Sequence, residues 1–166
     1  NETRTTTYVT FPSTISVRTG IVIKFNSAGT YQFFRVVNSS GGACVGQCVA
    51  VSSNSMVFSG WYSGSAGLAD TYNSTIVTFP AASGAAAFLV KFDLTGAYIN
   101  SQFVDSTTFN ESNEICGIDK DGNALFGGYY YTNAATVKNL AGTTLFTMPA
   151  GTGVNTQTSF FIKANM

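Results

Sequence analysis

An internal repeat of about 68 residues limits the folds open to this 166-residue chain more than any other feature of the sequence. Matching segments recur in one order and at nearly one spacing: residues 23–31 with 90–98, residues 58–62 with 126–130, and residues 78–80 with 147–149. The Ile-Lys pair of the first match returns a third time at residues 162–163. Such a pattern indicates a repeated structural unit, and we expect about four or five short strands in each unit.

The residue types in these segments predict an all-β fold with antiparallel sheets. Runs such as residues 6–11 and 20–25 are rich in Val, Ile, Phe, Tyr and Thr, and clusters of Gly, Asn and Ser separate the runs. β-branched and aromatic side chains suit a pleated sheet, whereas Gly and Asn suit the turns between strands. No helical periodicity is present, and even the alanine-rich residues 81–87 follow Pro80 and contain Gly84.

Two segments resemble the repeat of a known family. Residues 117–129 combine a strand that ends in Asp, a Gly-Asn turn and a second strand that ends in Gly-Tyr, and residues 88–96 read Phe-Leu-Val-Lys-Phe-Asp-x-x-Gly. Both are similar to the SBBP (seven-bladed β-propeller type) repeat of bacterial and archaeal surface proteins. Residues 51–55 depart from the pattern, because they lack the Asp and Gly of the turn. The resemblance implies propeller blades and no common catalytic activity.

The repeat divides the chain into about two and a half units. Residues 1–37 form an N-terminal half unit, residues 38–104 a second unit, and residues 105–166 a third, incomplete unit. A closed propeller takes about 4–8 blades, so we expect an incomplete propeller or an open array of blade-like sheets. Because the chain starts at Asn1, we expect a processed product or an excerpt of a longer protein.

Incomplete units predict association with further copies of the chain. An incomplete sheet leaves backbone groups unpaired and apolar faces uncovered, and either the rest of a longer protein or another copy can supply what is missing. Residues 1–11 contain the candidate donor strand because they alternate like an extended strand, with Thr5, Thr7, Tyr8 and Val9 as assembly residues. Donation from copy to copy is a head-to-tail contact, which builds rings or filaments.

The composition argues against several classes of function. Eight basic and eight acidic residues give a net charge of zero, so the chain lacks the basic field that attracts nucleic acids. The chain has no histidine, no Gly-x-Ser-x-Gly motif and no convincing pair of acids. We therefore predict neither an enzyme nor a catalytic, metal or cofactor site. The apolar runs fall short of the roughly 20 residues of a membrane helix, so we expect no membrane insertion.

The three cysteines leave three arrangements open. Cys44 and Cys48 flank a short loop with Gly46 as a pivot, which predicts a local disulfide in an oxidising compartment. The alternatives are a link between Cys44 and Cys116 and three free, buried thiols. We expect Cys48 and Cys116 to lie too far apart to bridge, because they occupy equivalent places on adjacent units.

Three asparagines are candidates for glycosylation. Asn38, Asn73 and Asn110 each begin an Asn-x-Ser/Thr sequence within a predicted loop, where a glycan has room. The alternative is a solvated turn asparagine at each position.

Two aromatic clusters are candidate ligand-facing sites, namely Trp61 with Tyr62 and Tyr129 with Tyr130. Because neighbours along a strand face opposite ways, we expect one residue of each pair to pack and the other to face outward. A sugar ring could stack on the outward residue.

Two repeated polar features suggest structural roles. Residues 119–123 have the oxygen spacing of the start of a calcium loop but lack its distal carboxylate, so we predict a hairpin turn. Lys24, Lys91 and Lys163 recur at one position of the unit, where we expect an edge-strand gatekeeper or a solvated face.

These observations favour a non-enzymatic, extracellular or cell-surface structural protein that assembles with copies of itself into a filament or surface array. The low charge, the abundant Thr and Ser, and the Asn-x-Ser/Thr sequences support this hypothesis. The competing hypothesis is an adhesin module of a larger β-propeller, which binds carbohydrate or protein through its aromatic loops.

Overall fold

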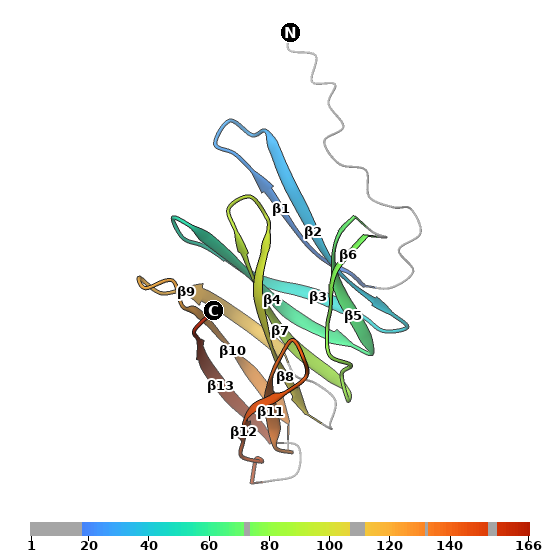
Figure 1. The fold of residues 1–166 in the computed structure, drawn as a ribbon. Coiled ribbons are helices and arrows are strands. Elements are labelled where there is room, and N and C mark those ends of the chain that lie inside the picture. Colours follow the sequence, from blue (N-terminus) through green and yellow to red (C-terminus); the bar gives the residue numbers. More distant parts are fainter. Residues whose placement is uncertain (1–17, 72–73, 107–111, 132, 153–155) are drawn as a thin grey trace.

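The computed structural model describes residues 18–71, 74–106, 112–131, 133–152 and 156–166 (Figure 1). These residues form thirteen strands in three antiparallel sheets, and no helix occurs among them. The predicted all-β, antiparallel fold is therefore confirmed.

Each sheet combines strands from distant parts of the chain. The first sheet has the order β1 (Gly20–Phe25), β2 (Tyr31–Ser40), β5 (Ser65–Thr71) and β6 (Ser74–Thr78). The central sheet has the order β12 (Thr144–Met148), β11 (Ala135–Asn139), β8 (Tyr98–Ser106), β7 (Ala85–Asp93), β4 (Ser55–Ser63) and β3 (Cys44–Val51). The third sheet has the order β13 (Gln157–Ala164), β10 (Ala124–Tyr131) and β9 (Ser112–Ile118). The expected boundary between the first two units, at residues 37–38, falls inside β2.

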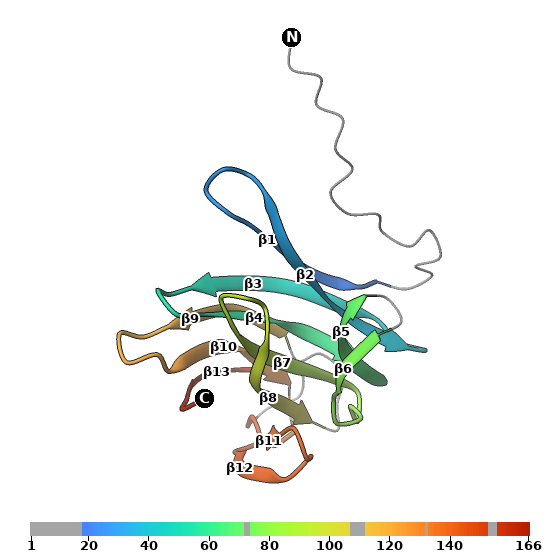
Figure 2. The ribbon, with the colours of Figure 1, turned by 45° about the horizontal axis from the view of Figure 1, so that its top comes forward.

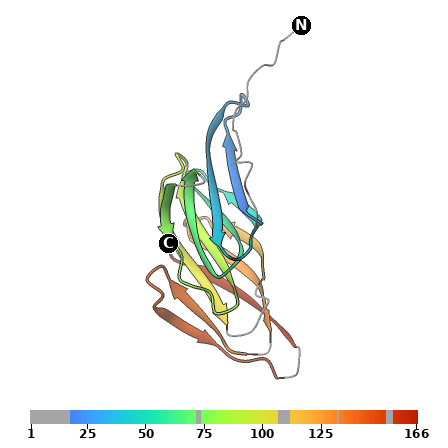
Figure 3. The same ribbon diagram turned by 90° about the vertical axis from the view of Figure 1, so that its right-hand side faces the viewer.

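The three sheets stack as layers, with the central sheet between the other two (Figure 2, Figure 3). Strand β7 shows how the layers hold together. Its residues Ala86, Phe88 and Val90 belong to the core cluster shared with the first sheet, whereas Ala87 and Leu89 belong to the cluster shared with the third sheet. Successive side chains of a strand point to opposite faces, so β7 is buried on both sides.

Lysines at one position of the unit connect neighbouring layers. Lys24 of β1 donates a hydrogen bond to the carbonyl of Leu94 at the end of β7. Lys91 of β7 is buried, and its Nζ donates to the carbonyl oxygens of Gly122 and Met166 at 2.6 Å each. The expected gatekeeper or solvated position is therefore wrong for Lys91, whose ammonium binds backbone carbonyls beside the third sheet.

The hairpins reuse one turn. Four turns contain a glycine at φ between 76° and 86°, three residues after an Asn or Asp, at residues 26–29, 93–96, 119–122 and 139–142. In the third of these, Asp119 Oδ1 accepts hydrogen bonds from the amides of Asp121 and Asn123 at 2.9 Å. Glycine adopts this left-handed backbone without steric cost. The predicted hairpin turn at residues 119–123 is confirmed, and the Asp119 carboxylate is engaged within it.

Substitution of Phe103 by alanine tests the packing between the first two layers. The Phe103 ring is buried against Tyr62 and Phe79, with centroid separations of 6.1 and 4.9 Å. We expect Phe103→Ala to lower the free energy of unfolding by about 3–5 kcal/mol, measured by urea denaturation. The matched control is Phe25→Ala, which removes a half-exposed ring and should cost about 1 kcal/mol or less. Equal losses in the two variants would contradict this account of the core.

Candidate functional site

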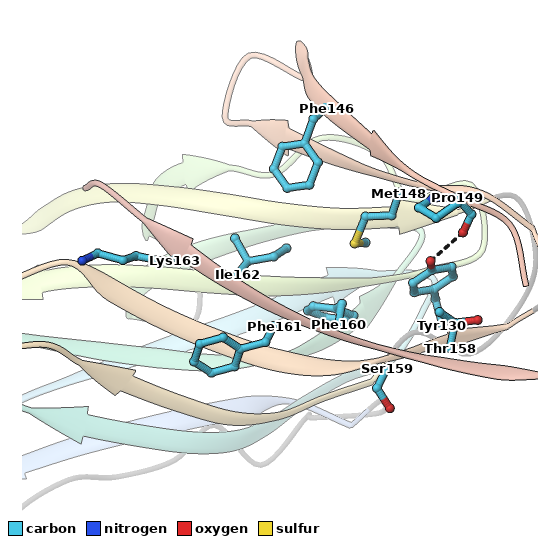
Figure 4. A pocket seen from close by; sticks show the side chains of 10 residues that line it. All are labelled: Tyr130, Phe146, Met148, Pro149, Thr158, Ser159, Phe160, Phe161, Ile162 and Lys163. Carbon is cyan, nitrogen blue, oxygen red and sulfur yellow. Dashed lines mark hydrogen bonds between the residues drawn. The ribbon is translucent and has the colours of Figure 1, made fainter.

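An apolar groove of about 440 Å³ lies between β12 and β13 (Figure 4). Both strands are edge strands, β12 of the central sheet and β13 of the third sheet. The residues lining the groove are mostly apolar: Tyr130, Phe146, Met148, Pro149, Thr158, Ser159, Phe160, Phe161, Ile162 and Lys163. The groove therefore combines an apolar floor with two sheet edges that no strand of the described part of the chain pairs with.

In the central sheet, the place beside β7 that corresponds to this groove is filled by an aromatic cluster. Tyr62, Phe79, Phe88 and Phe103 pack ring against ring, with centroid separations from 4.9 to 6.5 Å. Phe103 comes from β8, which pairs with the edge of β7 away from β4. Without Phe103, the other three rings would border an open space.

The third sheet repeats three members of this cluster, and no described residue takes the place of the fourth. The repeat places Tyr130 at the position of Tyr62 and Met148 at that of Phe79. Strand β13 aligns with β7, because Phe126 pairs with Ile162 as Phe58 pairs with Val90. This alignment places Phe160 at the position of Phe88.

The hydroxyl contacts of the two tyrosines support the equivalence of the two sites. The hydroxyl of Tyr62 donates to the carbonyl of Pro80 at 2.7 Å, and that of Tyr130 donates to the carbonyl of Pro149 at 2.6 Å. Among the described residues, no strand pairs with the edge of β13 away from β10. The groove is therefore the place where a counterpart of Phe103 would lie.

The charges around the groove do not support acid–base chemistry. Among the described residues that line it, the ionisable groups are the phenol of Tyr130, which is engaged with Pro149, and the ammonium of Lys163. Lys163 pairs with Asp119, its Nζ lying 2.6 Å from Asp119 Oδ2. This hydrogen bond lowers the pKa of Asp119 below its usual range and raises that of Lys163. The groove is suited to bind an uncharged, extended segment.

The outer face of the third sheet is also apolar. Phe161 is 65% exposed there, whereas Leu89, at the equivalent position of β7, is 0% exposed. Ile115 of β9 is a second exposed apolar residue of this sheet. The third sheet thus exposes a position that the central sheet buries under a further layer.

The predicted aromatic site is only partly brought together. Tyr62 and Tyr130 are each 1% exposed, so they are the packed members of the two pairs, and Tyr130 forms part of the groove floor. Trp61 and Tyr129 are half-buried, and the Tyr129 ring packs edge-on against Tyr131 at 5.6 Å. The alternation along the strands decides which residue of each pair packs inside.

The other predicted surface residues have separate positions. Asn38 lies within β2 opposite Gly67 and is half-buried, so the expectation that it lies in a loop is wrong. Asn73 and Asn110 lie outside the described residues, as do the assembly residues Thr5, Thr7, Tyr8 and Val9.

All three cysteines are free thiols in the structure, so it contains neither the predicted Cys44–Cys48 disulfide nor the alternative link between Cys44 and Cys116. Cys44 and Cys48 both lie on β3, where four residues of extended chain span roughly 13 Å. The pairing of β3 with β4 shifts between Gly46 and Cys48, and this β-bulge leaves Cys44 in the first core cluster while Cys48 meets Cys116 of β9. The expectation that Cys48 and Cys116 lie far apart is wrong, because the two units stack face to face.

Reasoning from the sequence missed the groove residues Phe146, Met148 and Phe160. The signal was present in two matches: Thr-Met-Pro at residues 147–149 against Thr-Phe-Pro, and Phe-Phe-Ile-Lys at residues 160–163 against Phe-Leu-Val-Lys. The matches do not show that Phe103 is buried among the other three rings of its cluster. The groove is recognised only from that burial, because it lies where a counterpart of Phe103 would lie.

Comparisons with known proteins add no relative. No protein-family model, curated protein or solved structure matches the chain. Within the described residues, no three His, Cys, Asp or Glu side chains gather as a metal site. No helix in the same part of the chain is long and apolar enough to cross a membrane.

Loss of the Tyr62 hydroxyl tests the tyrosine–proline contact that both sites share. Tyr62→Phe leaves the carbonyl of the half-buried Pro80 without this donor, so we expect the free energy of unfolding to fall by about 1–3 kcal/mol. Tyr129→Phe is the matched control, because Tyr129 is half-buried and we expect a change within about 0.5 kcal/mol. Denaturant unfolding of both variants provides the measurement, and similar losses would argue against a structural role for the contact.

Proposed function

We propose that this protein is a non-enzymatic structural protein of an extracellular or cell-surface assembly. In this proposal, copies join head to tail into a filament or array by completing one another's β-sheets. The observation that carries the proposal is the groove beside β13, where none of the described strands supplies the ring that Phe103 of β8 supplies in the central sheet.

The proposed donor is the segment of residues 1–11 of a neighbouring copy. Its assembly residues are Thr5, Thr7, Tyr8 and Val9, and residues 5–9 have no charge and consist of Thr, Tyr and Val, which suit a β-strand. When it pairs with the free edge of β13, main-chain hydrogen bonds supply affinity and a side chain that enters a pocket supplies specificity. Tyr8 supplies the ring, and it takes the place that Phe103 holds in the central sheet.

Donation of this kind joins two different surfaces of the same chain. A contact between unlike surfaces does not close on itself at two copies, so it continues into a ring or an open filament. The net charge of zero is compatible with many copies packed side by side, because it avoids long-range repulsion. The exposed Phe161 and Ile115 offer further apolar area for a neighbouring copy to cover.

The competing hypothesis, a carbohydrate- or protein-binding adhesin module, retains fewer residues. Burial of Tyr62 and Tyr130 leaves Trp61 and Tyr129 as its aromatic candidates. The resemblance to SBBP repeats and the glycosylation of Asn38, Asn73 or Asn110 also remain proposals.

A charge placed in the groove should block assembly. Phe146 lines the groove and is 46% exposed, so we expect Phe146→Asp to fold and to raise the concentration needed for assembly at least about tenfold, because the carboxylate would be buried by the donor strand. Leu145→Asp is the matched control: Leu145 is its neighbour on β12, is 48% exposed and does not line the groove. Sedimentation velocity and negative-stain imaging measure assembly, and equal effects of the two variants would refute the role of the groove.

Removal of the donor should also block assembly, and a peptide should replace it. We expect the chain without residues 1–11 to remain monomeric and to bind a peptide of residues 1–11 with saturable affinity, measured by fluorescence anisotropy. The peptide with Tyr8→Ser should bind more weakly by about tenfold or more, since it cannot fill the groove. Unchanged assembly of the truncated chain would count against strand donation. A wild-type chain that stays monomeric and binds glycans would favour the adhesin hypothesis.

A further inference from the structure

Two cysteine sulfur atoms meet between the central and third sheets. Cys48 Sγ and Cys116 Sγ lie 2.8 Å apart, although the two residues are 68 positions apart in the sequence. The amide of Cys116 also donates to Cys48 Sγ at 2.9 Å. The contact therefore fixes both the backbone and the side chain of Cys116 against Cys48.

Two packed strands, one from each sheet, position the two cysteines next to each other. Strand β3 is the last strand of the central sheet, β9 is the last strand of the third sheet, and the two strands pack against each other. Sulfur atoms in a disulfide lie about 2.05 Å apart, so closing the bond requires a movement of roughly 0.8 Å. A shift of that size needs only a small adjustment of the two side chains.

We propose that Cys48 and Cys116 form a disulfide that ties the central sheet to the third sheet. The inference is independent of the assembly proposal, because both cysteines belong to one chain. In the reaction, the two thiols lose two protons and two electrons as the S–S bond forms. An oxidised low-molecular-weight disulfide, such as glutathione disulfide, accepts them when its own S–S bond breaks to give two thiols.

Burial indicates when the bond forms. Desolvation, with the neighbouring Cys48 thiol, raises the pKa of Cys116 to about 12. The thiolate is the reactive species in disulfide exchange, so the Cys116 thiol of a folded, reduced chain reacts slowly at neutral pH. The bridge is therefore expected to form faster during folding, before Cys116 packs against β3.

Cys44 provides an internal control. It is fully buried in the cluster between the first and central sheets, and desolvation raises the pKa of its thiol to about 12. The bulge in β3 keeps it on the other face of the central sheet from Cys48. We expect Cys44 to remain a thiol after oxidation.

Mapping of the disulfide gives the direct test. The full-length chain is refolded with a mixture of reduced glutathione and glutathione disulfide, its free thiols are alkylated in denaturant, and the digest is analysed without reduction. We expect a peptide linked through Cys48 and Cys116, together with alkylated Cys44. Three alkylated cysteines, or any link that involves Cys44, would overturn the proposal.

Thermal unfolding gives an independent readout. Reduction of the wild-type protein in denaturant, followed by refolding with reductant, should lower Tm by on the order of 10 °C, because a bond that closes a long loop restricts the unfolded chain. Cys48→Ser, Cys116→Ser and the double variant should share one low Tm that reductant does not change. Cys44→Ala should keep its response to reductant even if its own Tm falls. A wild-type Tm that is insensitive to reductant would contradict the bridge.

Discussion

The structure depends on the burial of both faces of the central sheet around β7. In β7, alternate side chains enter two different cores, so both faces of this strand are shielded from water. A strand of this kind cannot form a stable sheet by itself and needs a layer above and a layer below. The buried Lys91 is compatible with this packing because its ammonium binds two carbonyl oxygens at the edge of the next layer.

The third sheet repeats the apolar side chains of the central sheet on both faces, but only one of its faces is packed against another of the described sheets. Phe161 occupies the place of Leu89 yet faces outward, and the groove beside β13 keeps three of the four positions of an aromatic cluster. Apolar area, free strand edges and few charges favour contact with another polypeptide over chemistry on a small substrate. The groove and the outer face are thus two consequences of one repeated pattern.

Predictions from the sequence succeeded where the signal was local or repeated. The strand runs, the hairpin turn at residues 119–123 and the packing of one tyrosine in each aromatic pair follow from propensity, turn chemistry and alternation. The predictions that failed depended on relations between layers. Asn38 lies in a strand and not in a loop, Lys91 is neither an edge-strand gatekeeper nor solvated, and Cys48 contacts Cys116. Each of these positions depends on which strand lies next to which.

The sequence by itself determined the all-β class, the repeat and the low charge, because these are properties of residue types and their spacing. Only the tertiary structure decided the pairing of Cys48 with Cys116 and the position of the groove. A single bulge in β3 changes the face to which later residues point, and no sequence period reports it. The groove arises where a cluster lacks one member, and a missing contact becomes visible only when the surrounding residues are placed in space.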